Sequence, residues 1–263
     1  MTIAPDREHH FGQSVIRRNK DVIIKTFFYP EDYYKEKYFL SLLRQEGINF
    51  IPRIISADDQ KYEIITPYYG ESLDDIDWRL RKLNWFCRIA SFMEKVWLIK
   101  TAIDSRYRKL GPVAFQFVEN YLSASYQTQM ARAGIEQEVI RRSIGWLGKV
   151  MHSCLKQPSI PALIHFDISP RNVLVNKNSF CVIDWSRAMY SELSIEIAIM
   201  REKFEMIDQP LTCISRAIRS KLNLNFIDNL AKCFSIYRKA KKIGTAISQA
   251  DYLRFVETTI SSS

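Results

Sequence analysis

Cysteine is scarce in this sequence and has no paired spacing. The 263 residues include five cysteines, none of them in a C-x-x-C pair: Cys87, Cys154, Cys181, Cys213 and Cys233. Disulfide frameworks need an even set of cysteines, and most zinc sites need close Cys or His pairs. The sequence therefore predicts neither kind of site, and we expect reduced thiols in a cytoplasmic protein.

Long apolar runs are also missing. No stretch approaches the ~18 apolar residues of a membrane-spanning helix. Residues 1–10 are polar and lack the apolar core of a signal peptide. Glycine and proline are few, and no internal repeat or low-complexity tract is visible. We therefore expect no membrane span and a cytoplasmic location.

The charge is biased toward basic residues, with 38 Lys and Arg against 29 Asp and Glu. Between Arg79 and Lys109, nine basic residues oppose only Glu94 and Asp104, a local excess of +7. Such a segment is either a solvated helical face or a site for an anionic substrate or surface. No basic motif interleaved with aromatic residues is present, so we expect no nucleic-acid partner.

The N-terminal third alternates short strands with one helix. Residues 15–18 and 22–28 are β-type runs separated by a polar turn. Residues 31–46 carry apolar side chains at helical spacing, and a glycine follows them. Residues 51–56 and 62–66 form two more apolar runs, which predict a second hairpin.

The rest of the chain is predicted to be mainly helical. Residues 78–107 and 116–155 have apolar side chains at helical intervals and few glycines or prolines. Residues 161–184 return to short β-type runs, and the chain from residue 191 is again helical. The pattern predicts an α+β fold with two lobes. A small β-rich lobe spans residues 1–66, and a larger, mostly helical lobe spans residues 67–263.

The most informative segment lies in the second lobe. His165, Asp167 and Asn172 form the pattern H-x-D-x-x-x-x-N, an apolar strand follows, and a second apolar strand ends at Asp184. Phosphoryl transfer needs an oriented hydroxyl and a divalent cation near the phosphate oxygens. Asp167 suits the first need, and the oxygen ligands of Asn172 and Asp184 suit Mg²⁺.

This segment resembles the catalytic loop and metal-binding strand of the protein-kinase superfamily. More narrowly, it resembles the aminoglycoside phosphotransferase and choline kinase branch, which has I-D-W or I-D-F where protein kinases have D-F-G. Ile183-Asp184-Trp185 fits that branch, and no A-P-E motif is present. The resemblance implies a bilobal kinase-like fold, ATP and Mg²⁺ as cofactors, and Asp167 as the catalytic base.

The resemblance also implies roles for neighbouring residues of the catalytic loop. His165 would brace the loop without acting as a base. Ser169 stands where protein kinases have a lysine. Arg171 would supply positive charge near the transferred phosphate, although an exposed loop arginine without that role is an equal alternative.

Upstream residues match the nucleotide-binding part of the same family. Lys25, in a strand-like run, resembles the lysine that holds the α- and β-phosphates, and Glu36 resembles its helical partner. Glu31 and Glu46 lie on the same stretch and compete with Glu36 for this assignment. Gly12 and Ser14 resemble a phosphate-covering loop, but this loop has only one glycine.

Residues 63–73 resemble the hinge that holds the adenine ring. Backbone groups of Pro67, Tyr68 and Tyr69 would bond the base, and Pro67 can offer only its carbonyl group. Taken together, the resemblance implies a kinase that transfers the γ-phosphate of ATP to a hydroxyl of a small molecule. The small molecule would be an antibiotic, a sugar or an amino alcohol.

Two alternatives remain open from the sequence. One is a kinase of a protein or of an envelope lipid or saccharide, although the missing A-P-E and D-F-G motifs disfavour an ordinary protein kinase. The other is a non-catalytic binding module with a kinase fold, which the sparse glycine loop suggests. The basic balance of the chain weighs slightly against a polycationic acceptor.

Overall fold

A computed structural model describes residues 8–11, 14–154, 159–176, 179–207 and 209–261. The chain divides into two compact units. The first comprises Met1–Ala102 and Leu163–Met189, and the second comprises Ile103–Ala162 and Tyr190–Ser263. These units group the chain differently from the predicted boundary between residues 66 and 67, so the two-lobe division stays a prediction.

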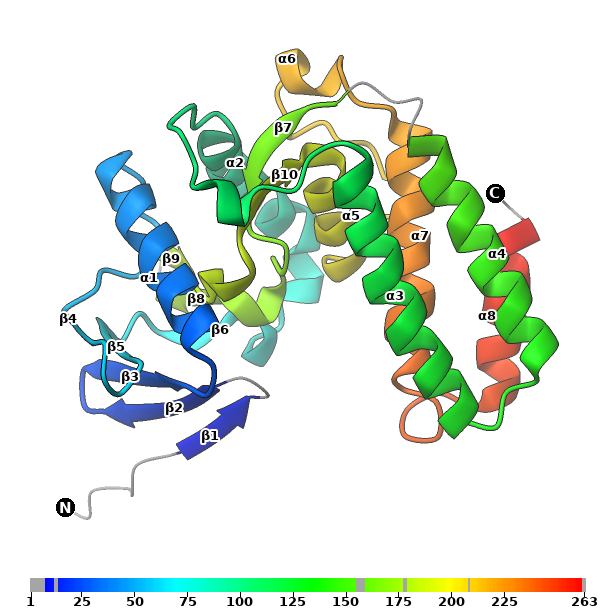
Figure 1. Cartoon of the computed structure of the whole chain (residues 1–263), viewed down its shortest axis with the longest axis horizontal. Helices are drawn as coiled ribbons and strands as arrows, with labels where there is room; N and C mark the ends of the chain where they lie inside the picture. The colour runs from blue at the N-terminus through cyan, green and yellow to red at the C-terminus, as the bar shows by residue number, and fades with distance from the viewer. Residues whose placement is uncertain (1–7, 12–13, 155–158, 177–178, 208, 262–263) are drawn as a thin grey trace. The chain divides into compact units, whose positions relative to one another are not determined.

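The first unit contains a five-stranded antiparallel sheet (Figure 1). Its strands, in spatial order, are β1 (Glu8–Phe11), β2 (Ser14–Asn19), β3 (Val22–Phe27), β5 (Glu63–Pro67) and β4 (Ser56–Asp58). Both predicted hairpins are therefore present. The first strand of the second hairpin is displaced from the predicted run 51–56, because residues 51–55 lie outside the sheet and β4 spans Ser56–Asp58.

Helix α1 (Pro30–Gln45) follows β3, within one residue of its predicted bounds. Pro30 occupies the start of the helix, where a missing N–H costs nothing. The acidic first turn and the basic last turn both suit the helix dipole. Tyr33 is fully buried and packs with Phe27 and Ile64, so α1 is fastened to the sheet by an apolar cluster.

A second, three-stranded sheet belongs to the same unit, and two of its strands lie in the chain between the candidate catalytic residues His165–Asn172 and Asp184. Its strands are β6 (Glu71–Ser72), β8 (Val173–Asn176) and β9 (Ser179–Val182). Helix α2 (Lys82–Trp97) contacts this sheet through Phe92, whose ring lies 5.7 Å from the ring of Phe180. The packing of α2 thereby supports the strand that leads to Asp184.

Short 3₁₀ segments and one strand complete the first unit. They are η1 (Leu73–Asp75), η2 (Trp78–Arg81), η4 (Pro170–Asn172), η5 (Trp185–Arg187) and β7 (Pro161–Ile164), whose first two residues belong to the second unit. η1 packs against η4 and β8, so the chain just after the hinge lies beside the catalytic loop.

The second unit is a bundle of helices with a short strand. Its elements are η3 (Ser105–Tyr107), α3 (Pro112–Arg132), α4 (Gln137–Cys154), β10 (Met189–Glu192), α5 (Leu193–Lys203), α6 (Arg216–Arg219), α7 (Leu224–Ala240) and α8 (Gln249–Ser261). α3 and α4 pack on each other and on α7, which also contacts α5 and α8 (Figure 1). The mixed α and β content confirms the predicted fold class.

Two long predicted helices are divided in the structure. Residues 78–107 contain η2, α2 and η3, and α2 ends at Trp97. Residues 116–155 contain α3 and α4, which are separated at Gly134 (φ 68°). Glycine adopts this left-handed conformation without steric cost, so a turn forms there. No helix within the described ranges has the length and apolar character needed to cross a bilayer.

Candidate active site

Lys25 joins two carboxylates that are far apart in the sequence. Its Nζ donates to Glu36 Oε2 at 2.6 Å and to Asp184 Oδ1 at 2.8 Å. Lys25 lies on β3, Glu36 on α1, and Asp184 just after β9. Two of the three side chains are well buried, and that of Asp184 is 34% exposed. The structure thus selects Glu36 from the three candidate glutamates as the partner of Lys25.

Charge coupling shifts the pKa of each member of this triad. Burial alone would lower the pKa of Lys25, but the carboxylates of Asp184 and Glu36 outweigh it and raise that pKa. Burial raises the pKa of Glu36 to about 7, against the opposing effect of Lys25. Burial would also raise the pKa of Asp184, but the Lys25 ammonium holds it well below its usual range. Asp184 is therefore a persistent anion.

His165 braces the catalytic loop from the inside. It is fully buried, and its Nε2–H donates to the carbonyl oxygen of Ile183 at 2.8 Å. Its Nδ1 accepts a 3.3 Å bond from the backbone N–H of Asp167. Its ring also lies edge-on to Trp185 at 4.6 Å. Burial lowers the pKa of His165, so the neutral ring fits this place.

Phe166 stands between the two motif residues with φ 65°. This left-handed conformation is unusual for a bulky residue and costs on the order of 1–3 kcal/mol. The Phe166 side chain is buried, and that packing offsets the backbone strain. Asp167, the expected base, thus directly follows a residue with a strained backbone.

Asp167 and Asn172 are tied together by the loop. Asn172 Nδ2 donates to the carbonyl oxygen of Asp167 at 2.8 Å, which leaves the amide oxygen for a cation. Arg171 Nη2 lies 3.9 Å from Asp167 Oδ2, and the arginine side chain is 62% exposed. Ser169 is buried, and its Oγ has no described hydrogen bond.

Asp184 is held in a defined orientation from its own side of the site. Its backbone is left-handed, with φ 65° and ψ 62°. Ser186 Oγ donates to Asp184 Oδ1 at 2.9 Å, and Ile183 N donates to the Asn172 carbonyl at 2.9 Å. One carboxylate and one amide oxygen are therefore anchored on adjoining segments. This pair of hard oxygen donors fits Mg²⁺, which completes its shell with water and phosphate oxygens.

The segment expected to bind the adenine ring, residues 67–69, offers few unbonded backbone N–H groups. Tyr68 N–H donates to the carbonyl oxygen of Asp21 at 2.7 Å, and Pro67 has no N–H. Tyr69 uses its hydroxyl to accept from the backbone N–H of Arg53 at 2.8 Å. Of the three expected residues, only Tyr69 has a backbone N–H outside the described hydrogen bonds. A nucleobase acceptor would therefore use Tyr69.

The expected phosphate loop is only partly visible. Gly12 lies outside the described residues. Ser14 begins β2 opposite Phe27 and is buried. Its expected contact with a phosphate group stays a prediction.

Three residues near the triad escaped the sequence reasoning. Ser186 bonds Asp184, as described above. Asp32 is partly buried, and burial raises its pKa while the charges of Lys35 and Arg187 lower it. A signal existed for Asp32, which precedes Glu36 by four residues and so shares its helical face. The packing of α1 on η5 that brings Arg187 nearby had no local signal.

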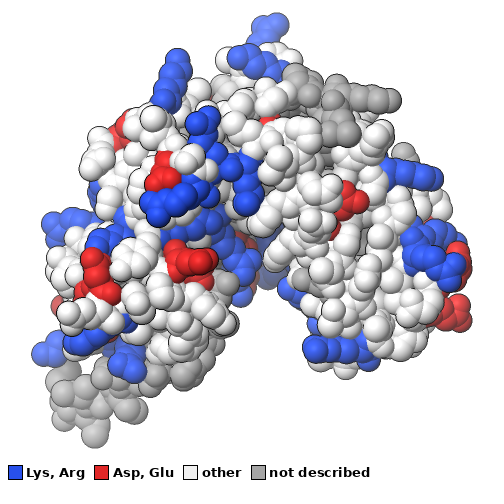
Figure 2. Space-filling view, viewed as in Figure 1, with Lys and Arg blue, Asp and Glu red and all other residues white. Residues whose placement is uncertain are grey.

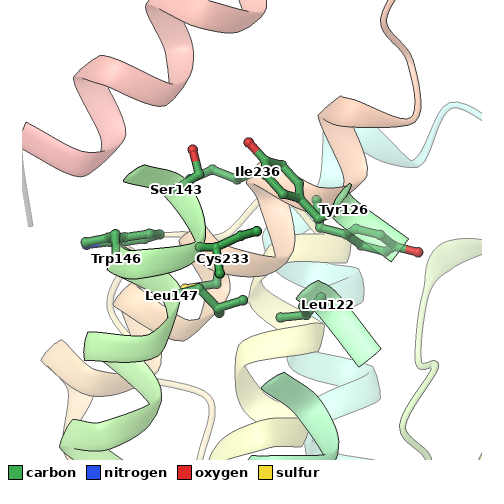
Figure 3. Close-up of a pocket in the computed structure, with 9 residues that line it drawn as sticks. Leu122, Tyr126, Ser143, Trp146, Leu147, Cys233 and Ile236 are labelled. Carbon is green, nitrogen blue, oxygen red and sulfur yellow. The ribbon is translucent and has the colours of Figure 1, made fainter. Parts of the chain in front are cut away.

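A separate pocket lies in the second unit, between α3, α4 and α7 (Figure 3). Its empty volume is about 280 Å³, including space open to solvent. Its lining is mainly apolar and aromatic: Leu122, Tyr126, Ser143, Ile144, Trp146, Leu147, Cys233, Ile236 and Tyr237. None of the candidate catalytic residues lines it. We regard it as a gap in helix packing.

Comparison with solved structures shows a shared fold at low identity. APH(2″)-IIIa in complex with GDP and kanamycin has a TM-score of 0.67 at 15% identity, covering 100% of this chain and 93% of that one. Choline kinase LicA from Streptococcus pneumoniae has a TM-score of 0.63 at 15% identity, with 100% and 95% covered. A choline/ethanolamine kinase family protein from Mesorhizobium loti has a TM-score of 0.64 at 10% identity, with 98% and 86% covered.

Comparison at the level of sequence families gives the assignment. A search among curated proteins finds no match. Residues 15–213, about three quarters of the chain, match the phosphotransferase enzyme family (APH). This range includes Lys25, Glu36, Asp167, Asn172 and Asp184. The chain therefore belongs to the phosphotransferase enzyme family.

Proposed function

We propose that this protein transfers the γ-phosphate of ATP to a hydroxyl group of a small molecule. The observation that carries the proposal is the contact of Lys25 with both Glu36 and Asp184. This contact brings the Lys25 ammonium, which we propose binds the phosphates, next to Asp184, which we propose binds the metal. The family match and the kinase fold of the similar structures support the same reaction.

Asp167 is proposed to orient the acceptor hydroxyl and to take its proton. The acceptor oxygen forms a bond to the γ-phosphorus, the bond to the β,γ-bridging oxygen breaks, and ADP leaves. Asn172 holds the backbone of Asp167, and Lys25 binds the α- and β-phosphates. Asn172 and Asp184 would hold Mg²⁺, which neutralises charge on the phosphate oxygens when bound.

The acceptor class is inferred from chemistry and from similar structures. One neighbouring structure contains kanamycin, another contains streptomycin with ATP, and others are choline kinases. All of these acceptors are small molecules with hydroxyl groups. We therefore propose an antibiotic, sugar or amino alcohol as the acceptor class for this chain.

Substitution of the proposed base tests the reaction. Asp167→Asn should lower kcat by about 100-fold to 10,000-fold, since positioned proton transfer contributes that much. The dissociation constant for the nucleotide should change little, because Asp167 does not hold the phosphates. Labelled ATP with a panel of hydroxyl-bearing acceptors measures the first quantity, and titration calorimetry measures the second.

Glu138→Gln is a matched control for the loss of one carboxylate. Glu138 is exposed on α4 and pairs with Arg141, outside the catalytic unit. Its turnover should equal that of the wild type. Transfer retained at the wild-type rate by Asp167→Asn would remove Asp167 from the mechanism.

A non-catalytic binding module is disfavoured by the side chains present. Lys25 contacts both Glu36 and Asp184, and the backbone of Asp167 is hydrogen-bonded to the side chains of His165 and Asn172. A chain that only bound nucleotide would not need Asp167.

The alternative of a kinase that acts on proteins makes a distinct prediction. Label from ATP should then enter casein or the chain itself.

A further inference from the structure

The net positive charge of the first unit is confined to one segment. That unit contains 19 Lys and Arg and 17 Asp and Glu. Residues 78–102, which contain η2 and α2, account for six of the basic residues and only one acidic residue. The remainder of the unit has 13 basic and 16 acidic residues. Residues 78–102 are therefore strongly basic, whereas the rest of the unit is slightly acidic. Figure 2 shows one face of the molecule, on which blue basic side chains outnumber red acidic ones.

The same segment exposes leucines. Leu80, on η2, is 81% exposed, which makes it the most exposed large apolar side chain among the described residues. Leu83 in the first turn of α2 is 52% exposed, and Leu98 just after the helix is 62% exposed. Leu80, Arg81, Lys82 and Leu83 thus present apolar and cationic groups together. We call residues 79–98 on this side the η2–α2 surface.

The exposed stripe of α2 is separate from the stripe that holds the fold. The buried stripe of the helix contains Phe86, Ile89, Met93 and Val96, so the helix is already anchored. The exposed stripe includes Ser91 and Lys95 and continues to Leu98 at helical spacing. The exposed leucines therefore do not contribute to the buried stripe and remain accessible to an external partner.

The start of α2 concentrates positive charge further. Its first turn has no acidic residue, and its N-cap Arg81 makes no side-chain cap bond. The positive end of the helix dipole therefore lies beside Arg79, Arg81 and Lys82, an arrangement that is unfavourable unless an anion is nearby. Three exposed carboxylates, Asp74, Asp75 and Asp77, precede this point, and Asp77 is the N-cap residue of η2, so they offset part of this positive charge.

We propose that the η2–α2 surface docks on an anionic lipid bilayer. Basic side chains attract anionic headgroups, and exposed leucines enter the boundary between headgroups and acyl chains. A second copy of the chain fits less well, since two basic surfaces repel each other. A nucleic acid would match the charge but would leave the leucines without apolar contact.

Vesicle binding by the full chain tests the proposal. Vesicles of phosphatidylcholine alone are compared with vesicles containing about 30% phosphatidylglycerol, a composition that mimics an anionic leaflet. Co-sedimentation should show at least about tenfold stronger binding to the anionic vesicles. Binding should weaken several-fold in about 0.5 M salt, which screens the attraction.

Paired variants separate the surface from the rest of the molecule. Leu80→Ser with Leu83→Ser, and separately Arg81→Glu with Lys82→Glu, should each weaken anionic-vesicle binding by about tenfold or more. Leu80, Leu83 and Arg81 are exposed and Lys82 is partly exposed, so the melting temperature should stay near that of the wild type. The controls are Val113→Ser, which is equally exposed elsewhere, and Lys221→Glu; both should bind like the wild type.

Three results would overturn the proposal. The first is equal binding to neutral and anionic vesicles. The second is anionic-vesicle binding that neither paired variant weakens. The third is the absence of vesicle binding combined with tight binding to a short RNA duplex or self-association in sedimentation velocity. In that last case, the RNA or a second copy would be the partner of the η2–α2 surface.

Discussion

At the scale of single residues, the site depends on how Lys25 shares its charge. Breaking a buried ion pair by removing one partner commonly costs about 3–5 kcal/mol, because the other charge stays buried. Glu36 is the more deeply buried of the two carboxylates, so it cannot easily exchange its partner. Asp184 is partly exposed and has the freedom to accept a second cation. Glu36 thus anchors the Lys25 ammonium, and Asp184 remains accessible to a ligand.

Ser186 gives a prediction for the metal. Ser186→Ala should raise the Mg²⁺ concentration needed for half-maximal nucleotide binding by about tenfold. Groups that orient a metal ligand typically contribute 10-fold to 100-fold to metal affinity. The serine donates to the same carboxylate that would bind Mg²⁺. Nucleotide titrations at several Mg²⁺ concentrations measure this effect. The matched control is Ser91→Ala on the exposed face of α2, which should leave the Mg²⁺ dependence unchanged.

His165 gives a prediction for pH. Its pKa in the folded chain lies below the ordinary value of 6.5, so the unfolded chain takes up the proton first as the pH falls. The stability contributed by the neutral ring is present above that ordinary value. It is lost as the pH falls from there through the lower pKa of the folded state. The raised pKa of Glu36 acts in the opposite sense over the same range, so the test is a difference: the urea midpoint of the wild type, relative to that of a His165 variant, should fall between about pH 7.5 and about pH 5.5.

Two histidine variants make this test specific. In His165→Gln the fall with pH should be shallower than in the wild type, although the variant is less stable overall. His152 is exposed on α4, and His152→Gln should reproduce the wild-type slope. Equal slopes in all three proteins would show that His165 does not carry the pH dependence.

At the scale of elements, the junction between β6 and β8 fixes the chain after the hinge. Gly70 has φ 121°, and a Cβ atom there would overlap the carbonyl oxygen of Val175. Ser72 Oγ then donates to the carbonyl of Arg171 at 3.3 Å, so this short strand also contacts the catalytic loop. The close approach is possible only without a side chain.

Gly70→Ala should therefore destabilise the protein by about 3 kcal/mol or more, through both the clash and the backbone strain. The control is Gly145→Ala, on helix α4, where nothing lies within 4 Å of the added atom. That change should stabilise the helix by roughly 0.5–1 kcal/mol. Chemical denaturation of both variants measures the two effects, and equal stabilities would contradict the close approach at Gly70.

The elements themselves were predicted unevenly from sequence. The α1 helix and the β2–β3 hairpin were predicted closely, because apolar period and polar turns both mark their ends. The division of residues 116–155 at Gly134 was missed, since apolar spacing continues through the turn. The end of α2 at Trp97 was missed for the same reason. Periodicity identifies a helix better than it identifies where the helix stops.

At the scale of the whole molecule, nucleotide binding should raise the melting temperature. A ligand at 100 times its dissociation constant contributes about 2.7 kcal/mol to stability. The Mg²⁺-dependent part of that gain should vanish in Asp184→Asn, which removes the charged metal ligand. Thermal melts with ATP, with and without Mg²⁺, measure it. An undiminished Mg²⁺ effect in the variant would place the metal on other residues.

The basic surface on η2 and α2 matters at this same scale. In the sequence this surface corresponds to an excess of basic charge between Arg79 and Lys109. The structure adds that Leu80 and Leu83 are exposed among those charges. Exposure depends on which helical face the rest of the unit covers, so the sequence alone could not distinguish a buried leucine from an exposed one.

The sequence by itself indicated the family and a candidate catalytic segment. His165, Asp167 and Asn172 lie within one short loop between apolar strands, and such local spacing leaves few geometries. The tertiary structure alone decided which glutamate reaches Lys25 and that Asp184, 159 positions away, shares the same ammonium. It also decided that the Tyr68 N–H is already bonded to Asp21. These contacts join distant segments, so they follow from packing and not from local pattern.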